Sequence, residues 1–182
     1  LFTMQRKIVI TGGPGTGKTT LIKEFESRNF KCTPEISRKI TRTARSKGVD
    51  HLFLEDPLLF SKLLLEGREQ QFIEAHKSNS DLIFFDRGIP DVHAYMNHFG
   101  TVYPKTFLEK SNQYRYNHIF LLPPWKEIYI TDDERYESYE LSISIHNHLK
   151  ITYSDLNYNI IEVPLDSVKN RADFILSQLN IL

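Results

Sequence analysis

The stretch KIVITGGPGTGKTTL, residues Lys7 to Leu21, decides the fold of this chain. Its apolar run Ile8 to Ile10 predicts a short strand, and Gly12 to Thr19 satisfies the pattern G-x-x-x-x-G-K-[ST] of a phosphate-binding loop. The residues that follow favour a helix, so the order is strand, phosphate loop, helix. The alternative is a glycine-rich turn that merely joins a strand to a helix, but the flanks are those that phosphate binding requires.

The residue types of this loop suit a polyphosphate. Glycines let the backbone curl until its N–H groups point inward, and the positive end of the next helix adds to them. We expect Lys18 to contact the β- and γ-phosphates, the Thr19 hydroxyl to ligate Mg²⁺, and Thr20 to reach the α-phosphate. The expected nucleotide-binding residues are Gly13, Pro14, Gly15, Thr16, Gly17, Lys18, Thr19 and Thr20. ATP is the expected nucleotide and GTP the alternative, since the chain has no clear N-K-x-D tetrad for guanine.

The composition predicts one globular domain over residues 1–182. Hydrophobic residues make up 40% and charged residues 25% of the chain, which is ordinary for a globular protein with a real core. Lys plus Arg and Asp plus Glu number 23 each, so no nucleic-acid partner is expected. The lone Cys32 excludes an internal disulfide. No apolar run reaches membrane-spanning length and no signal peptide is expected, so a cytoplasmic location is predicted, for a monomer or a homodimer.

Five short apolar segments alternate with helix-favouring segments along the chain. The predicted strands are 8–10, 30–33, 82–85, 118–122 and 159–163, and the predicted helices are about 18–28, 35–47, 56–77, 90–98, 104–112, 134–156 and 165–179. Asp56-Pro57 opens the helix at 56–77, and Leu165 begins the apolar stripe of the last helix. The apolar positions expected to carry the helix at 56–77 are Leu59, Leu63, Phe72 and Ile73. Within 134–156, the alternating run Leu141 to Ile145 would equally suit a strand. This order predicts an α/β fold whose parallel sheet binds its ligand at the carboxyl ends of the strands.

Two residues directly follow the apolar run 82–85. Asp86 is expected to hold the Mg²⁺ shell opposite Thr19, and the alternative is a helix N-cap. Arg87 could bind a transferred or acceptor phosphate, or could form an internal ion pair with Asp86 or Glu35. Asp91 could line an acceptor pocket together with Tyr95, although ordinary packing is favoured.

The second and fourth strands also lead to charged residues. Glu35 could orient or deprotonate an attacking hydroxyl, or could be an acid that favours the start of a helix. Arg135 could reach the γ-phosphate from a mobile lid, or could pair with the neighbouring Asp132 and Asp133 on the surface. The candidate catalytic residues are thus Lys18, Glu35, Asp86, Arg87 and Arg135, and the candidate metal ligands are Thr19 and Asp86.

The runs ITGGPGTGKTTLIKEFESRNF, TPEISRKI and FFDRGIPDVHAY, with a Pro-Pro-Trp segment leading to DDER, carry a family resemblance. The chain resembles the predicted-ATPase family related to AAA proteins, which includes nicotinamide riboside kinase domains and is similar to small nucleoside and nucleotide kinases. The resemblance implies a three-layer P-loop NTPase fold with strand order 2-3-1-4-5, a helical lid within about 125–150, and a base-contacting loop at Val163 to Asp166. It also assigns nucleotide and Mg²⁺ roles to Lys18, Thr19 and Asp86, an acceptor-side role to Glu35, and the lid arginine to Arg135.

The expected activity is Mg²⁺-ATP-dependent phosphoryl transfer to a small, nucleoside-like acceptor that carries a hydroxyl. The segment from Trp125 to Arg135 is longer than in the riboside kinases and lacks their glycine, so the resemblance does not identify the acceptor. The alternative is a nucleotide-dependent ATPase or GTPase switch, or a regulatory binding module, with no small-molecule acceptor. Dependence on an acceptor separates the two hypotheses.

Overall fold

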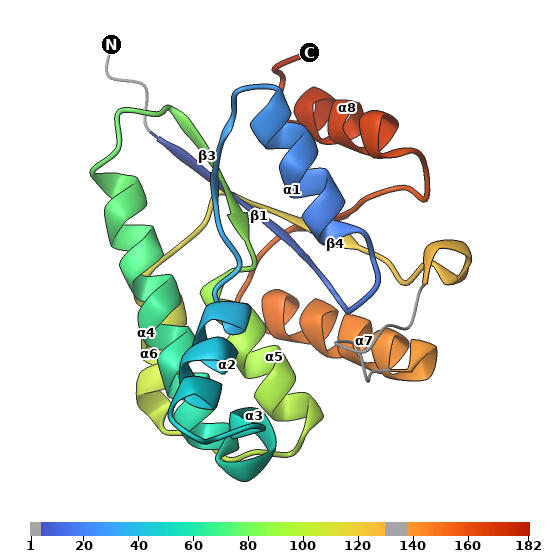
Figure 1. Cartoon of the computed structure of the whole chain (residues 1–182). Coiled ribbons are helices and arrows are strands. Elements are labelled where there is room, and N and C mark those ends of the chain that lie inside the picture. Colours follow the sequence, from blue (N-terminus) through green and yellow to red (C-terminus); the bar gives the residue numbers. More distant parts are fainter. Residues whose placement is uncertain (1–4, 130–137) are drawn as a thin grey trace.

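A five-stranded parallel sheet forms the centre of the molecule (Figure 1). The computed structural model describes residues 5–129 and 138–182. The strands are β1 (Arg6–Gly12), β2 (Lys31–Thr33), β3 (Leu82–Asp86), β4 (His118–Leu122) and β5 (Ile160–Glu162). Their order across the sheet is β2-β3-β1-β4-β5, which confirms the α/β class and the order that the resemblance implied.

Helices cover both faces of this sheet, giving three layers (Figure 1). The cores on the two faces show that α1 and α8 pack on one face, and that α4, α5, α6 and α7 pack on the other. The bounds are α1 (Lys18–Ser27), α2 (Ser37–Ser46), α3 (Leu52–Glu55), α4 (Pro57–His76), α5 (Ile89–His98), α6 (Lys105–Gln113), α7 (Tyr139–Asp155) and α8 (Val168–Gln178), with a short 3₁₀ helix at Lys126–Ile128.

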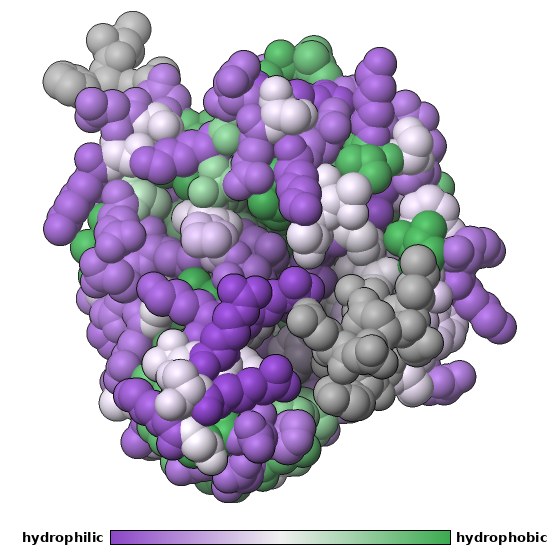
Figure 2. Space-filling view, in the orientation of Figure 1, coloured by the Kyte–Doolittle hydropathy of each residue, from purple (hydrophilic) through white to green (hydrophobic). Residues whose placement is uncertain are grey.

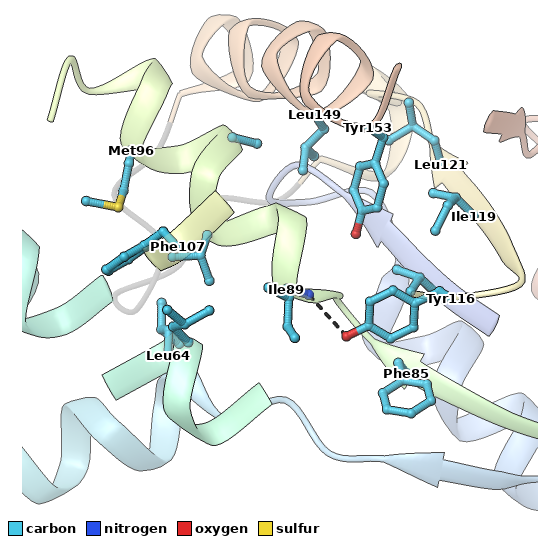
Figure 3. Close-up of a cluster of buried hydrophobic side chains, with 14 of the residues drawn as sticks. Leu64, Phe85, Ile89, Met96, Phe107, Tyr116, Ile119, Leu121, Leu149 and Tyr153 are labelled. Carbon is cyan, nitrogen blue, oxygen red and sulfur yellow. Dashed lines mark hydrogen bonds between the residues drawn. The ribbon is translucent and has the colours of Figure 1, made fainter. Parts of the chain in front are cut away.

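Continuous apolar runs in β1 and β3 fill the core on both faces, because successive side chains of a strand point to opposite sides. Ile8 and Ile10 are fully buried under α1 and α8, whereas Val9 between them is buried on the other face. Phe84 follows the same rule in β3 and stacks on Phe25 of α1, with the ring centroids 3.9 Å apart. Figure 3 shows the core of the opposite face, where the residues shown include Phe85, Tyr116, Leu149 and Tyr153.

The start of α4 is as predicted, but its buried face is not. The Asp56 carboxylate accepts a hydrogen bond from the Leu59 N–H at 2.9 Å, and Pro57 is the first helical residue. The expected apolar positions Leu59 and Leu63 are exposed and half-buried respectively, while Leu64 and Leu65 are buried. The short helix α3, directly before Asp56, was not predicted.

The alternating run at Leu141 to Ile145 is helical, so the strand alternative is wrong. Ser142 and Ile145, three positions apart, share the buried side of α7, and Ile143 is exposed. The alternation was misleading because a serine usually faces water, whereas the Ser142 hydroxyl is buried and donates to the Pro14 carbonyl of the phosphate loop. Residues 134–137 of the predicted helix lie outside the described residues.

The last helix begins at Val168, later than predicted. The Ser167 hydroxyl accepts from the Asn170 N–H at 3.2 Å and so caps the helix. Leu165, which was assigned to the apolar stripe, precedes the helix and is exposed. Among the described helices, not one combines the length and apolarity that crossing a membrane requires.

The stacked pair of Phe84 and Phe25 leads to a stability prediction. Replacing Phe84 by alanine should lower the free energy of unfolding by about 3–5 kcal/mol, because it leaves a cavity between the sheet and α1. Chemical denaturation measures this loss. As the control, Phe53→Ala removes a ring that is 42% exposed and should cost much less; equal losses for the two variants would contradict the assigned core.

Candidate functional site

The carboxyl ends of β1, β2 and β3 bring the sequence-predicted residues to one edge of the sheet. Parallel pairing places Ile10 of β1 opposite Asp86 of β3, so the phosphate loop and Asp86 leave adjacent strands side by side. Glu35 follows β2, the next strand beyond β3. The charges of Glu35, Asp86 and Arg87 all influence the pKa of Lys18, so these residues form one electrostatic cluster.

The carbonyl groups of the phosphate loop are held by donors from four parts of the chain. Lys18 Nζ donates to the carbonyl oxygens of Gly12 and Gly13 at 2.8 and 2.7 Å. Arg87 also donates to the Gly12 carbonyl at 3.1 Å. Farther round the loop, Ser142 of α7 donates to the Pro14 carbonyl at 3.0 Å, and Arg171 of α8 donates to the Thr16 carbonyl at 3.0 Å.

This arrangement leaves the backbone N–H groups of the loop for a ligand. Those of Gly13, Gly15, Thr16 and Gly17 donate to no acceptor among the described residues. Gly15 and Gly17 have φ angles of 71° and 85°, a left-handed conformation that glycine adopts without strain. Successive N–H groups in such a turn form a concave anion site, and the start of α1 adds its positive end. The loop therefore suits a phosphate chain.

Lys18 is buried within this cradle. Burial and the nearby charge of Arg87 lower the pKa of Lys18 to about 7, although Asp86, Asp91 and Glu35 work in the opposite direction. A bound polyphosphate would bring negative charge to this ammonium group and raise its pKa again. Lys18 would then exchange the carbonyls of Gly12 and Gly13 for phosphate oxygens.

Asp86 offers a carboxylate suited to a divalent cation. Its side chain is 6% exposed, and Oδ1 has no hydrogen-bond partner among the described residues. Burial raises the pKa of Asp86, against the opposing charges of Lys18 and Arg87. A hard cation such as Mg²⁺ takes oxygen ligands and would compensate this buried carboxylate. The N-cap alternative for Asp86 is wrong, because α5 begins with Gly88 as its N-cap.

Arg87 pairs with Asp91, which differs from the ion pair with Asp86 or Glu35 that the sequence allowed. Arg87 adopts a positive φ of 73° and donates to Asp91 Oδ1 at 3.1 Å. Its guanidinium also lies over the ring of Tyr95, 5.2 Å from the ring centroid. The contacts to Gly12 and Asp91 hold the guanidinium beside the phosphate loop, where an anionic group can meet it.

Asp91 is a buried hub and does not line a pocket. Its carboxylate is 0% exposed and accepts from the hydroxyls of Thr11 and Tyr153, both at 2.6 Å, and from the Gly88 N–H at 3.0 Å. Burial alone would raise the pKa of Asp91, but the charges of Arg68 and Arg87 and the two hydroxyls lower it below its ordinary value. The hub thus ties β1, α7 and the segment after β3 together.

Glu35 supports the start of a helix, as one of its two sequence readings expected, and its acceptor-side role stays a prediction. Its carboxylate accepts from the Ser37 N–H at 2.9 Å and the Ser37 hydroxyl at 2.5 Å, and so supports the start of α2. Burial would raise the pKa of Glu35, but Ser37 and the charge of Arg87 lower it below its ordinary value. The carboxylate is therefore ionised at neutral pH, within the electrostatic reach of Lys18.

Other sequence-predicted residues lie round this edge or outside the described chain. Thr19 and Thr20 are exposed in the first turn of α1. Figure 2 shows strongly hydrophilic side chains over α2 beside a hollow in the centre of this face. Arg135 lies outside the described residues, as does the whole DDER run. The described residues contain no cluster of three or more His, Cys, Asp or Glu that could hold a metal.

Sequence reasoning missed Ser142 and Arg171 as parts of the site. Both hold loop carbonyls over long chain separations, 128 residues for Ser142 and 155 for Arg171. Nothing in their local sequence marks them, since a serine and an arginine in amphipathic helices normally face water.

A profile of AAA domains matches residues 7–171 of the chain. The chain belongs to this AAA domain family. The match starts in β1 and ends at Arg171, so it includes every described residue of the site. No curated protein matches this chain.

Solved structures show the same fold in two kinds of kinase. Deoxyadenosine kinase from M. mycoides, solved with dCMP and dCDP, is similar over 97% of this AAA domain and 100% of the kinase chain, with 18% identity and a TM-score of 0.69. NadR protein solved with NAD and AMP-PNP is similar over 98% of this chain, with 16% identity and a TM-score of 0.73. The AAA domain spans 51% of that NadR chain. These likenesses confirm the kinase-like P-loop fold.

The Asp91 hub leads to a second stability prediction. Asp91→Asn should lower the free energy of unfolding at neutral pH by about 3–5 kcal/mol, because it leaves Arg87 without its buried counter-charge and turns an amide N–H toward other donors. Urea denaturation measures the loss. Tyr153→Phe removes one donor and keeps the charge pair, so it should cost only about 1–2 kcal/mol; an Asp91→Asn variant as stable as the parent would contradict the hub.

The same hub has a pH dependence. Because the pKa of Asp91 in the folded protein lies below its unfolded value, its contribution to stability is present above about pH 3.9 and is lost as the pH falls through the folded pKa. Asp91→Asn should therefore show less loss of stability on acidification than Tyr153→Phe does. Denaturation midpoints measured between neutral and acid pH test this comparison.

Proposed function

We propose that the protein is a Mg²⁺-ATP-dependent phosphotransferase that moves the γ-phosphoryl group to the hydroxyl of a small, nucleoside-like acceptor. One observation carries the proposal: Lys18 of the phosphate loop shares a single electrostatic cluster with Glu35, Asp86 and Arg87. A loop alone indicates nucleotide binding, and the ionised carboxylate and guanidinium beside it supply what transfer to a hydroxyl needs.

Each residue would have a distinct role. Lys18 and Arg87 would neutralise charge on the transferred group, which is where electrostatic catalysis acts. Thr19 and Asp86 would hold Mg²⁺, which would neutralise negative charge on the phosphates when bound. Glu35 would orient the acceptor hydroxyl and take its proton. Arg135, in a lid within about 125–150, would complete the charge stabilisation and exclude water.

The similar solved structures support a nucleoside-like acceptor. One is a deoxyadenosine kinase by name, and NadR was also solved with NR, at 15% identity and a TM-score of 0.74. ATP is the proposed nucleotide and GTP is the alternative. We further propose one domain over 1–182, a cytoplasmic location, and a monomer or homodimer.

A nucleotide-dependent switch without an acceptor is a second candidate, favoured by the hydrogen bonds of Glu35. Both of its carboxylate oxygens are engaged at the start of α2, so the residue could serve that helix alone. In that case hydrolysis would be slow, and a partner protein would bind differently to the nucleotide-bound and nucleotide-free states.

Transfer of isotope from labelled ATP tests the proposal directly. The protein with Mg²⁺ and γ-labelled ATP is screened against nucleosides, nucleotides and cofactor precursors, and a labelled acceptor is the expected result. Release of inorganic phosphate alone, with no labelled acceptor from any class, would contradict the kinase and favour the switch.

Glu35→Gln separates the two candidates. Its amide oxygen can still accept from Ser37, so α2 should keep its start, but the general base is lost and transfer should fall by about 10²–10⁴-fold. Nucleotide affinity should change by less than about threefold, because Glu35 is proposed to act on the acceptor and not on the nucleotide. Glu66→Gln, at an exposed position of α4, is the control and should keep full transfer activity. A Glu35→Gln variant that transfers phosphate as fast as the parent would contradict the role of Glu35 as the base.

Lys18 gives a pH prediction for nucleotide binding. Its pKa of about 7 in the ligand-free site means that it is mostly neutral at pH 8, so Mg·ATP binding should take up a proton there and much less at pH 6. Affinity should consequently fall as the pH rises through 7. Titration calorimetry in buffers of different ionisation enthalpy measures the uptake; Lys18→Arg, always charged, should show none, and a parent without uptake at pH 8 would contradict the assignment.

A further inference from the structure

Arg171 occupies an unusual place at the back of the phosphate loop. It lies in the first turn of α8, and its side chain is 2% exposed. Its Nη1 donates to the Thr16 carbonyl at 3.0 Å, and the guanidinium carbon lies 5.7 Å from the Trp125 ring centroid. A Cβ on Gly17 would come within 2.9 Å of the same Nη1, so the glycine makes room for the arginine.

The charge of Arg171 has no counter-ion among the described residues. No ion pair between described residues includes it, and its Nε and Nη2 have no hydrogen-bond partner among them. Burial alone lowers the pKa of Arg171, with no carboxylate to raise it. An uncompensated buried charge is costly, and a neutral donor would hold a carbonyl equally well, as the Ser142 hydroxyl does at Pro14. The cation itself therefore needs an explanation.

We propose that Arg171 is a positioning residue. Its positive charge, on the side of the phosphate loop away from the ligand, favours the binding of a nucleoside di- or triphosphate. Its hydrogen bond to the Thr16 carbonyl polarises the Thr16–Gly17 peptide, which makes the Gly17 N–H a stronger donor toward phosphate. The positive charge and the anionic phosphate chain lie on opposite sides of the loop and attract each other. This inference rests on the proposed nucleotide binding and adds a preference for more than one phosphate.

A series of nucleotides with different numbers of phosphates tests the role of the charge. Arg171→Gln keeps an amide donor but loses the charge, and Arg171→Lys keeps the charge. We expect Arg171→Gln to weaken ADP and ATP by about tenfold, the loss of one charge-assisted contact, with AMP changed by less than about threefold. Arg171→Lys should regain much of the ADP and ATP affinity. Titration calorimetry with Mg²⁺ gives all three affinities.

Arg28→Gln is the matched control. Arg28 also joins α1 to α8, through an ion pair with Asp173 at 2.5 Å, but it makes no contact with the loop. The Arg28→Gln variant should lose some stability and keep its affinities for AMP, ADP and ATP.

Two results would overturn the inference: ADP and ATP affinities of Arg171→Gln that match the parent, or equal losses for AMP, ADP and ATP that lysine does not restore. If Arg171→Gln does not fold, Arg171→Lys decides. If Arg171→Lys binds AMP as the parent does and ADP nearly as tightly, the proposed role of the charge is supported. If it loses affinity equally for AMP, ADP and ATP, that role is contradicted. A parent protein that binds none of the nucleotides contradicts the proposed function itself, so the two failures are distinguishable.

Discussion

The outward anchoring of the phosphate-loop carbonyls is the interaction on which the site depends. A curled glycine-rich backbone presents both N–H and C=O groups, and an anion is attracted only if the carbonyls are turned away from it. Here Arg87, Ser142 and Arg171 donate to the carbonyls of Gly12, Pro14 and Thr16, and Lys18 donates to those of Gly12 and Gly13 until a phosphate replaces them. Three of these donors are cations, so the same contacts that shape the loop also make it positive.

The fold places these donors through long-range packing. β1 and β3 lie side by side in the middle of the sheet, which brings Arg87 to the loop. α7 packs against α5 and presents Ser142, and α8 packs against α1 and presents Arg171. The buried carboxylate of Asp91 joins β1 to α7 through Thr11 and Tyr153. The core and the site are thus parts of one framework, and disturbing α7 or α8 should loosen the loop.

The sequence predicted those features that are local or periodic. The phosphate loop is a contiguous motif, the strands are short apolar runs, and Asp56-Pro57 marks the start of α4 by capping chemistry. The placement of Asp86 and Glu35 followed from a general property of parallel sheets. The register of the buried face in α4 was wrong because adjacent apolar residues, Leu63, Leu64 and Leu65, allow more than one helical face.

The missed parts of the site depend on tertiary contacts. The roles of Asp91, Ser142 and Arg171 arise from partners far along the chain, and the same residue types on surface helices would carry no such meaning. Arg87 was recognised as a site residue and packing was favoured for Asp91, which is buried, but the ion pair between the two was not predicted. The lid arginine at position 135 stays a prediction.

Backbone amide NMR of the phosphate loop on addition of Mg·ADP tests the central claim most directly. The account predicts large downfield shifts for the amide protons of Gly13, Gly15, Thr16 and Gly17, because free N–H groups acquire phosphate acceptors. Amides remote from the site, such as those of α6, should stay in place. Loop amides that do not respond to saturating nucleotide, while signals elsewhere do, would contradict the assigned cradle.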